Sequence, residues 1–247
     1  MSDRPGLRFH AYDWARGRES LMAEGDGTAA HQLLIVPPLF GEMHRCRRLI
    51  RDVMRELWMR DVDCWLPELP GVGESELPLD RVGWDDWIDA VASAGRAVAR
   101  IARARPHVAS LRGGALVDHA APAIGWWRFS PRPGAALLRD LLRSRQLAER
   151  EAGHATTLAA LETEALAGAT ELAGYALGGG LAAGLAQATP VTVEPLRVVG
   201  LASEEGAYDA ALPGPALWRR AEPGDDPDLA ILIAEDIRRW IDHCDGN

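Results

Sequence analysis

The sequence predicts an α/β fold in which helices flank a mostly parallel sheet. Short apolar runs of strand character alternate along the chain with amphipathic helix patterns, which is typical of βαβ units. Prolines end the apolar run 31–40, and glycines follow the run 62–69, as turns after buried strands require. With 247 residues, of which 47% are hydrophobic, the chain suits one large domain, which we expect to span residues 1–247.

The predicted elements follow in chain order. Strands are expected at 7–12 (an edge strand), 31–40, 62–69, the start of 108–120, 123–130 and 195–203. Amphipathic helices are expected at 44–60, at 84–101 and from Pro227 onward, with Asp226 as the cap of the last. The segment 134–190, rich in Ala, Leu and Gly, interrupts the alternation. We expect it to form a helical lid over the carboxyl edge of the sheet, where ligands bind in such folds.

The bulk composition excludes several classes of function. A net charge of −9 disfavours nucleic-acid binding, which needs a basic face. Three widely spaced cysteines indicate neither a disulfide framework nor a zinc site, and suggest a reducing compartment. No signal-peptide core and no apolar run long enough for a membrane span is recognised. We therefore expect a soluble cytoplasmic protein without a metal or cofactor, and leave open whether it forms a homodimer.

The stretch 108–120 reads as a buried strand, a tight turn and a helix of small residues. In an α/β-hydrolase this place holds G-x-S-x-G, with the nucleophilic serine at the centre. The five positions here are Ser110, Leu111, Arg112, Gly113 and Gly114, so the central residue is arginine. Any βα loop can carry such glycines. The order of strand, elbow, helix, strand, inserted lid, strand and helix nevertheless predicts an α/β-hydrolase-like fold.

Several motifs resemble, in the same order, the exosortase A system-associated hydrolase 2 family. They are PPLFGEMHRCRRL, LPELPGVGES, SLRGGAL, LRDLLRSR, ELAGYALGGGLAAGL and ALWRRAEPGDDPDLA. The resemblance implies a role beside exopolysaccharide and PEP-CTERM protein-sorting genes, acting on an ester, acyl or glycosyl-linked substrate. It also implies that arginine at the elbow is a family feature. The chain departs from the family by Ser110 at the first elbow glycine and by Pro37 where histidine is common.

A catalytic triad is not recognisable. Arginine carries no lone pair to attack with, so Arg112 cannot be the nucleophile. The base would follow the last strand, where Glu222 but no histidine is found, and the acid position offers Glu204 or Glu205. Whether the protein is an enzyme therefore stays open, with a catalytically silent pseudoenzyme that binds a ligand or assists assembly as the alternative.

An anion site is the chemistry that these residues favour. The amide of Gly113 and one near Leu39 or Phe40 would form an oxyanion hole, to which Arg112 adds a positive charge. A small-molecule, glycan or acyl ligand, in particular an anionic one, is the expected partner. Two alternatives remain: Arg112 acts as a catalytic electrophile, or it only ties the loops together through an ion pair with Glu42 or Glu68.

Overall fold

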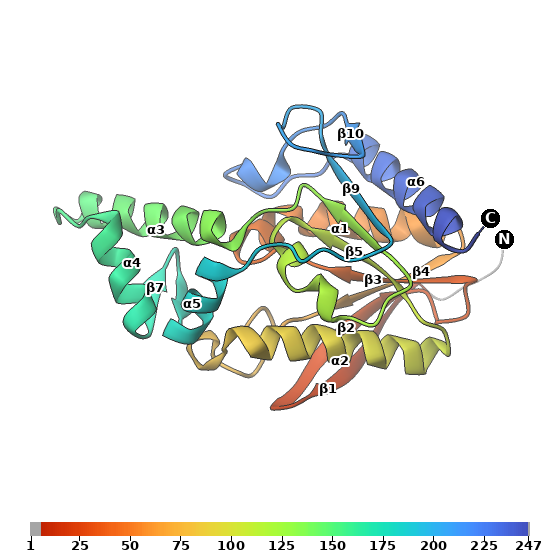
Figure 1. The fold of residues 1–247 in the computed structure, drawn as a ribbon, viewed down its shortest axis with the longest axis horizontal. Helices are drawn as coiled ribbons and strands as arrows, with labels where there is room; N and C mark the ends of the chain where they lie inside the picture. Colours follow the sequence, from red (N-terminus) through yellow and green to blue (C-terminus); the bar gives the residue numbers. More distant parts are fainter. Residues whose placement is uncertain (1–5, 247) are drawn as a thin grey trace.

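An eight-stranded sheet forms the centre of the computed structural model, which describes residues 6–246 (Figure 1). Its strand order is β1-β2-β4-β3-β5-β6-β9-β10. The strands are β1 (Leu7–Trp14), β2 (Gly17–Glu24), β3 (His31–Val36), β4 (Val62–Pro67), β5 (His107–Leu111), β6 (Trp126–Phe129), β9 (Leu196–Leu201) and β10 (Ala210–Leu212). All neighbours from β4 to β10 run parallel, so the predicted mostly parallel sheet is confirmed. Residues 1–5 and 247 of the expected domain lie outside the described residues.

Helices cover both faces of the sheet. The long helices are α1 (Gly41–Trp58), α2 (Trp84–Ala102), α3 (Gly134–Glu151), α4 (Leu158–Ala167), α5 (Gly179–Gln187) and α6 (Pro227–Cys244). Successive strand residues enter opposite cores, because side chains alternate across a strand. Leu34 and Val36 pack with residues of α2, whereas Leu33 and Ile35 pack with residues of α1 and α6. This double burial explains why the central strands read as continuous apolar runs.

The hairpin of β1 and β2 was only half predicted. β1 is the expected edge strand, but β2 carries GRESLMAE, in which polar residues hide the strand pattern. Pairing on both sides decides its structure, since it runs antiparallel to β1 and to β4.

The last helix begins as expected: the Asp226 carboxylate accepts a hydrogen bond from the Leu229 amide at 2.8 Å.

Residues 134–190 are inserted between β6 and β9, which are parallel neighbours in the sheet. They form α3, α4, a small hairpin of β7 (Thr170–Leu172) and β8 (Tyr175–Leu177), and α5, and extend beyond one end of the sheet (Figure 1). The insertion is packed onto the body. A Cβ atom at Gly184 would lie 2.2 Å from the Cβ of Trp84, so this glycine permits close contact between α5 and α2. That lid-like opening occurs stays a prediction.

The chain after β5 is less helical than expected. Short 3₁₀ segments, η2 (Arg112–Leu116) and η3 (Asp118–Ala120), replace the predicted helix. The bend between them turns Asp118 inward, where it accepts hydrogen bonds from Ser110 and Arg128. In the described part of the chain, no helix combines the length and the apolar character that a membrane crossing needs.

Candidate functional site

The carboxyl ends of three neighbouring parallel strands bring the site together. Arg112 follows β5 directly, Ser130 follows β6, and Glu204 comes three residues after β9. Because these strands run in one direction, the loops that follow them meet at one edge of the sheet. Arg112 occupies the turn with a φ of 54°, a left-handed conformation that is costly for a residue with a side chain.

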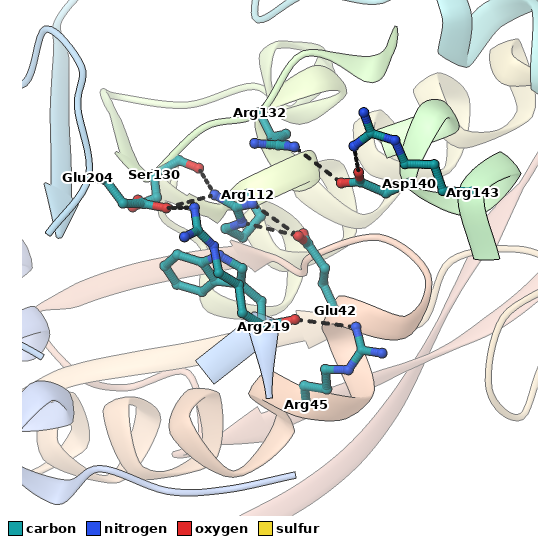
Figure 2. A network of polar contacts seen from close by, with 10 residues as sticks. Glu42, Arg45, Arg112, Ser130, Arg132, Asp140, Arg143, Glu204 and Arg219 are labelled. Atoms are coloured by element: carbon teal, nitrogen blue, oxygen red, sulfur yellow. Dashed lines mark hydrogen bonds and ion pairs between the residues drawn. The ribbon is translucent and has the colours of Figure 1, made fainter. Parts of the chain in front are cut away.

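Arg112 is held in place from several sides (Figure 2). Its Nη2 and Nε donate to Oε1 of Glu42 at 3.0 and 3.3 Å, and Nη1 donates to the Ser130 carbonyl at 3.0 Å. Oε1 of Glu204 lies 3.8 Å from Nη1. Only 5% of the Arg112 side chain is exposed. Of the two expected carboxylate partners, Glu42 is correct and Glu68 is wrong, because Glu68 lies against Gly73 in a separate cleft with Phe9.

Trp218 closes the remaining side of the guanidinium. It belongs to η4 (Leu217–Arg219), which follows β10, and its ring centroid lies 4.3 Å from the Cζ of Arg112. This distance is that of a cation–π contact, which gains strength when the pair is withdrawn from water. The ring also meets Phe129 edge-on, with 6.0 Å between centroids. Arg112 is thus fixed by two carboxylates, a carbonyl and an aromatic face.

Glu42 contacts the Arg112 guanidinium more closely than Glu204 does, at 3.0 Å against 3.8 Å. Burial raises the pKa of Glu42, and the neighbouring Arg112 only partly opposes that rise. The second oxygens of Glu42 and Glu204 are buried without a hydrogen-bond partner. Glu204 is also shared with Arg219, whose Nη2 lies 3.5 Å from its Oε1. Removing Arg112 would leave both acids in a poorly hydrated place.

A cavity of about 690 Å³, here called the Arg112 cavity, opens beside this cluster. The insertion contributes part of its wall through α3 and the β7–β8 hairpin. The lining residues are Leu39, Phe40, Gly41, Glu42, Arg45, Arg112, Arg132, Leu137, Asp140, Leu141, Ser144, Ala173, Tyr175, Trp218, Arg219, Arg220 and Ala221. Its size falls within the range of ordinary small-molecule sites.

The sequence-predicted residues divide between the cavity and other places. Leu39, Phe40, Glu42 and Arg112 line it together. Gly113 does not, because Leu39 and Leu137 cover it: a Cβ atom there would meet Cδ1 of Leu137 at 2.6 Å. The role of the Gly113 amide as an oxyanion donor stays a prediction.

Glu204 stands behind the wall as a partner of Arg112 and Arg219, and is not itself a lining residue. Glu222 is exposed and belongs neither to the lining nor to the partners of Arg112.

The serine and cysteine side chains near the turn at Arg112 are either hydrogen-bonded to a carboxylate or buried in the core. Ser110 donates to Oδ2 of Asp118 at 2.6 Å, and Arg128 donates to both oxygens of that carboxylate at 2.8 Å. Burial raises the pKa of the Cys46 thiol to about 12, so no thiolate forms there at neutral pH. Of the described residues, Ser144 is the one serine that lines the cavity, and none of the lining residues is a histidine. Among residues 6–246, no group of His, Cys, Asp and Glu side chains is arranged to hold a metal ion.

Backbone strain is concentrated around the same cavity. Six non-glycine residues between 6 and 246 have positive φ, and three of them, Phe40, Arg112 and Ala173, line the cavity. A fourth, Ser130, supplies the carbonyl that receives Arg112. Such conformations cost of order 1–3 kcal/mol each and gather at functional sites. The positions of these residues favour the cavity as the candidate functional site.

Several residues of this site were not identified from the sequence. They are Arg45, Ser130, Arg132, Trp218, Arg219 and Arg220. Trp218, Arg219 and Arg220 belong to the motif ALWRRAEPGDDPDLA, but the sequence assigned no role to them. Two adjacent arginines beside a tryptophan in that loop were the available signal. Arg45 and Arg132 lie in a helix and a loop without any pattern that distinguishes them.

Comparison with solved structures places the fold. Est1E from Butyrivibrio proteoclasticus superposes with a TM-score of 0.60 at 13% identity, covering 97% of this chain and 99% of that one. A thermophilic esterase from Thermogutta terrifontis, solved with malate bound, gives a TM-score of 0.57 at 16% identity, covering 96% and 99%. No protein-family model and no curated protein matches the sequence.

The class of protein follows from these observations: the chain has the α/β-hydrolase fold, over nearly its whole length. At 13 and 16% identity, the similarity to the two esterases defines the fold alone. The chemistry of the site must come from this chain's own residues.

Proposed function

We propose that the protein is a non-hydrolytic member of the α/β-hydrolase fold, whose cleft binds a ligand without cleaving it. In hydrolases of this fold, the nucleophile, the acid and the base follow in that chain order, with the nucleophile on a strained strand-to-helix turn. Arg112 on its left-handed turn, Glu204 after β9 and Trp218 after β10 fit these three places in order. We take them as replacements for the triad, and hence Arg112 as the residue at the serine position.

The state of Arg112 is the observation that carries the proposal. Its guanidinium is paired with Glu42, bonded to the Ser130 carbonyl and stacked on Trp218, with 5% of the side chain exposed. A group in this condition neither attacks a carbonyl carbon nor moves a proton, because an arginine side chain stays protonated. It supports the wall of the cavity, which is the structural role that the sequence left open beside ligand binding and electrophilic catalysis.

The insertion 134–190 fits the role of a lid over this cleft. Leu137, Asp140, Leu141 and Ser144 of α3 and Tyr175 of β8 line the Arg112 cavity, so movement of the insertion would change access to it. We include the lid in the proposal on this support. The three cysteines are free, which agrees with the expected cytoplasmic location. A homodimer stays a prediction that a mass measurement in solution tests.

A second candidate is the hydrolase activity implied by the resemblance to the exosortase A system-associated family. The motifs around the first loop, the elbow and the Trp218 loop favour it, and they would connect the protein with exopolysaccharide or PEP-CTERM surface-protein export. The ligand would then be an acyl or glycan compound of that system. The two candidates differ in one measurable property, which is whether a serine is activated.

A fluorophosphonate probe tests the choice. We expect no stoichiometric labelling of the folded wild-type protein and no turnover of p-nitrophenyl esters above the background rate. Ser110→Ala and Ser144→Ala serve as controls, because these variants remove the serine beneath the elbow and the lining serine. Labelling of the wild type that either substitution abolishes would replace the proposal by the second candidate.

A further inference from the structure

The Arg112 cavity carries more positive charge than its own carboxylates neutralise. Five of its lining residues are arginines, and two, Glu42 and Asp140, are acidic. If Glu204 behind the wall is included, the arginines still exceed the carboxylates by two. This excess is notable in a chain whose net charge is −9. A concave basic site on an acidic protein attracts anions locally, because the low-dielectric walls concentrate the field.

Arg112 is not among the cavity arginines that lack a carboxylate partner. Arg112 is used by Glu42 and Glu204, and Arg132 pairs with Asp140 at 3.1 Å. Arg45 donates to the Trp218 carbonyl at 3.2 Å but forms no ion pair within residues 6–246. Arg220 is exposed and likewise forms no ion pair in that part of the chain. Figure 2 shows Arg45 near the cluster around Arg112.

An additional donor without an acceptor belongs to the same wall. Nε of Arg132 is buried and has no hydrogen-bond partner. A buried N–H group without an acceptor costs about 1–3 kcal/mol, so an oxyanion that reached it would remove an existing penalty. Unneutralised guanidinium groups and an unsatisfied N–H together match an acceptor-rich, negatively charged head group, such as a carboxylate or phosphate.

The rest of the lining is apolar. Leu39, Phe40, Leu137, Leu141 and Tyr175 contribute to it, and the rings of Phe40 and Tyr175 meet edge-on at 5.4 Å. At about 30 Å³ for a group the size of water, 690 Å³ accommodates roughly twenty non-hydrogen atoms. A bare inorganic anion would leave most of that space and its apolar surface unfilled.

We infer that the Arg112 cavity binds an amphipathic oxyanion, namely a carboxylate or phosphate monoester that carries an acyl-type chain. Arg45 and Arg220 hold the head group, and the leucine and aromatic side chains hold the chain. The inference rests on the proposed function, because it assigns the cleft to ligand binding and takes Arg112 as part of the cavity wall.

Isothermal titration calorimetry with decanoate and decyl phosphate, each below its micellar concentration, tests the site. The affinity should depend both on the contacts of the guanidinium groups with the head group and on the presence of the chain. Arg45→Gln and Arg220→Gln should each weaken binding of the preferred ligand about tenfold or more, since each removes a charge-assisted hydrogen bond. Arg48→Gln is the matched control: Arg48 lies one turn further along α1, pairs with Asp225 and does not line the cavity. This variant should bind as the wild type does.

Two further compounds separate the head from the chain. Inorganic phosphate lacks the chain and decanol lacks the charge, so each should bind at least tenfold more weakly than decyl phosphate. Preference for decanoate or for decyl phosphate assigns the head group, and either supports the inference.

The inference is overturned if the wild type binds neither ligand, if decanol binds equally well, or if both cavity variants behave like Arg48→Gln. None of these results would affect the proposed function, which only fluorophosphonate labelling or ester turnover contradicts.

Discussion

Arg112→Ala tests whether this residue holds the loops together. The substitution removes a side chain that is 5% exposed. It leaves Glu42, at 13% exposure, without its cation, and leaves Glu204, at 9% exposure, with Arg219 alone. Breaking a buried ion pair from one side costs about 3–5 kcal/mol, because the remaining charge stays unpaired. For a domain of this size each kcal/mol corresponds to roughly 2–4 °C, so the melting temperature should fall by roughly 6 to 20 °C.

Three further variants, measured by chemical and thermal unfolding, serve as comparisons for Arg112→Ala. Arg112→Ala combined with Glu42→Gln should be less destabilised than Arg112→Ala alone, since the double variant removes one of the unpaired charges. Arg112→Gly should lose about 1 kcal/mol less than Arg112→Ala, because glycine tolerates the φ of 54°. Arg48→Ala, at a side chain 68% exposed, should cost at most about 1 kcal/mol. A fall of 1 kcal/mol or less in Arg112→Ala would refute the structural role of the pair.

Two other perturbations follow from the structure. The pKa of Glu42 is raised by burial, so its contribution to stability is fully present below its unfolded pKa of 4.5 and is lost as the pH rises through the folded pKa. The stability of the wild type relative to Glu42→Gln should therefore increase as the pH falls from 7 toward 4.5; a difference independent of pH would contradict the raised pKa. Gly184→Ala would place a Cβ atom 2.2 Å from that of Trp84, and should cost about 1–3 kcal/mol and speed hydrogen exchange in α5. Unchanged exchange there would mean that α5 is not anchored by this contact.

The sequence predicted the body of the fold because its signals are local. Apolar runs such as 31–36 and 62–67 are buried on both faces, and that composition shows in the residues themselves. Helix periodicity gave α1, α2 and α6 for the same reason, and Asp226 before Pro227 marked the start of the last one. β2 was missed because its strand state depends on pairing with β1 and β4, which its own residues do not encode.

The site was predicted in part. The turn at Arg112 has a sequence signature, and a buried arginine requires a carboxylate, so Glu42 was within reach of the sequence argument as one of two candidates. The sequence could not choose between Glu42 and Glu68, because that choice depends on which loop lies over the elbow. Gly113 was expected at the ligand, but Leu137 of the insertion packs against it. This contact depends on how the insertion packs on the body of the fold.

By itself, then, the sequence determined the layered α/β architecture and the arginine in the turn that follows β5, since both are properties of residue types in order. Only the tertiary structure decided that Arg112 is enclosed by Glu42, Glu204 and Trp218, and that Arg45 and Arg220 at the cavity form no ion pair with any residue from 6 to 246. These side chains come from loops and a helix far apart in the chain. Their pairing depends on distances that strand order and packing set, and on competition between carboxylates for the same guanidinium groups.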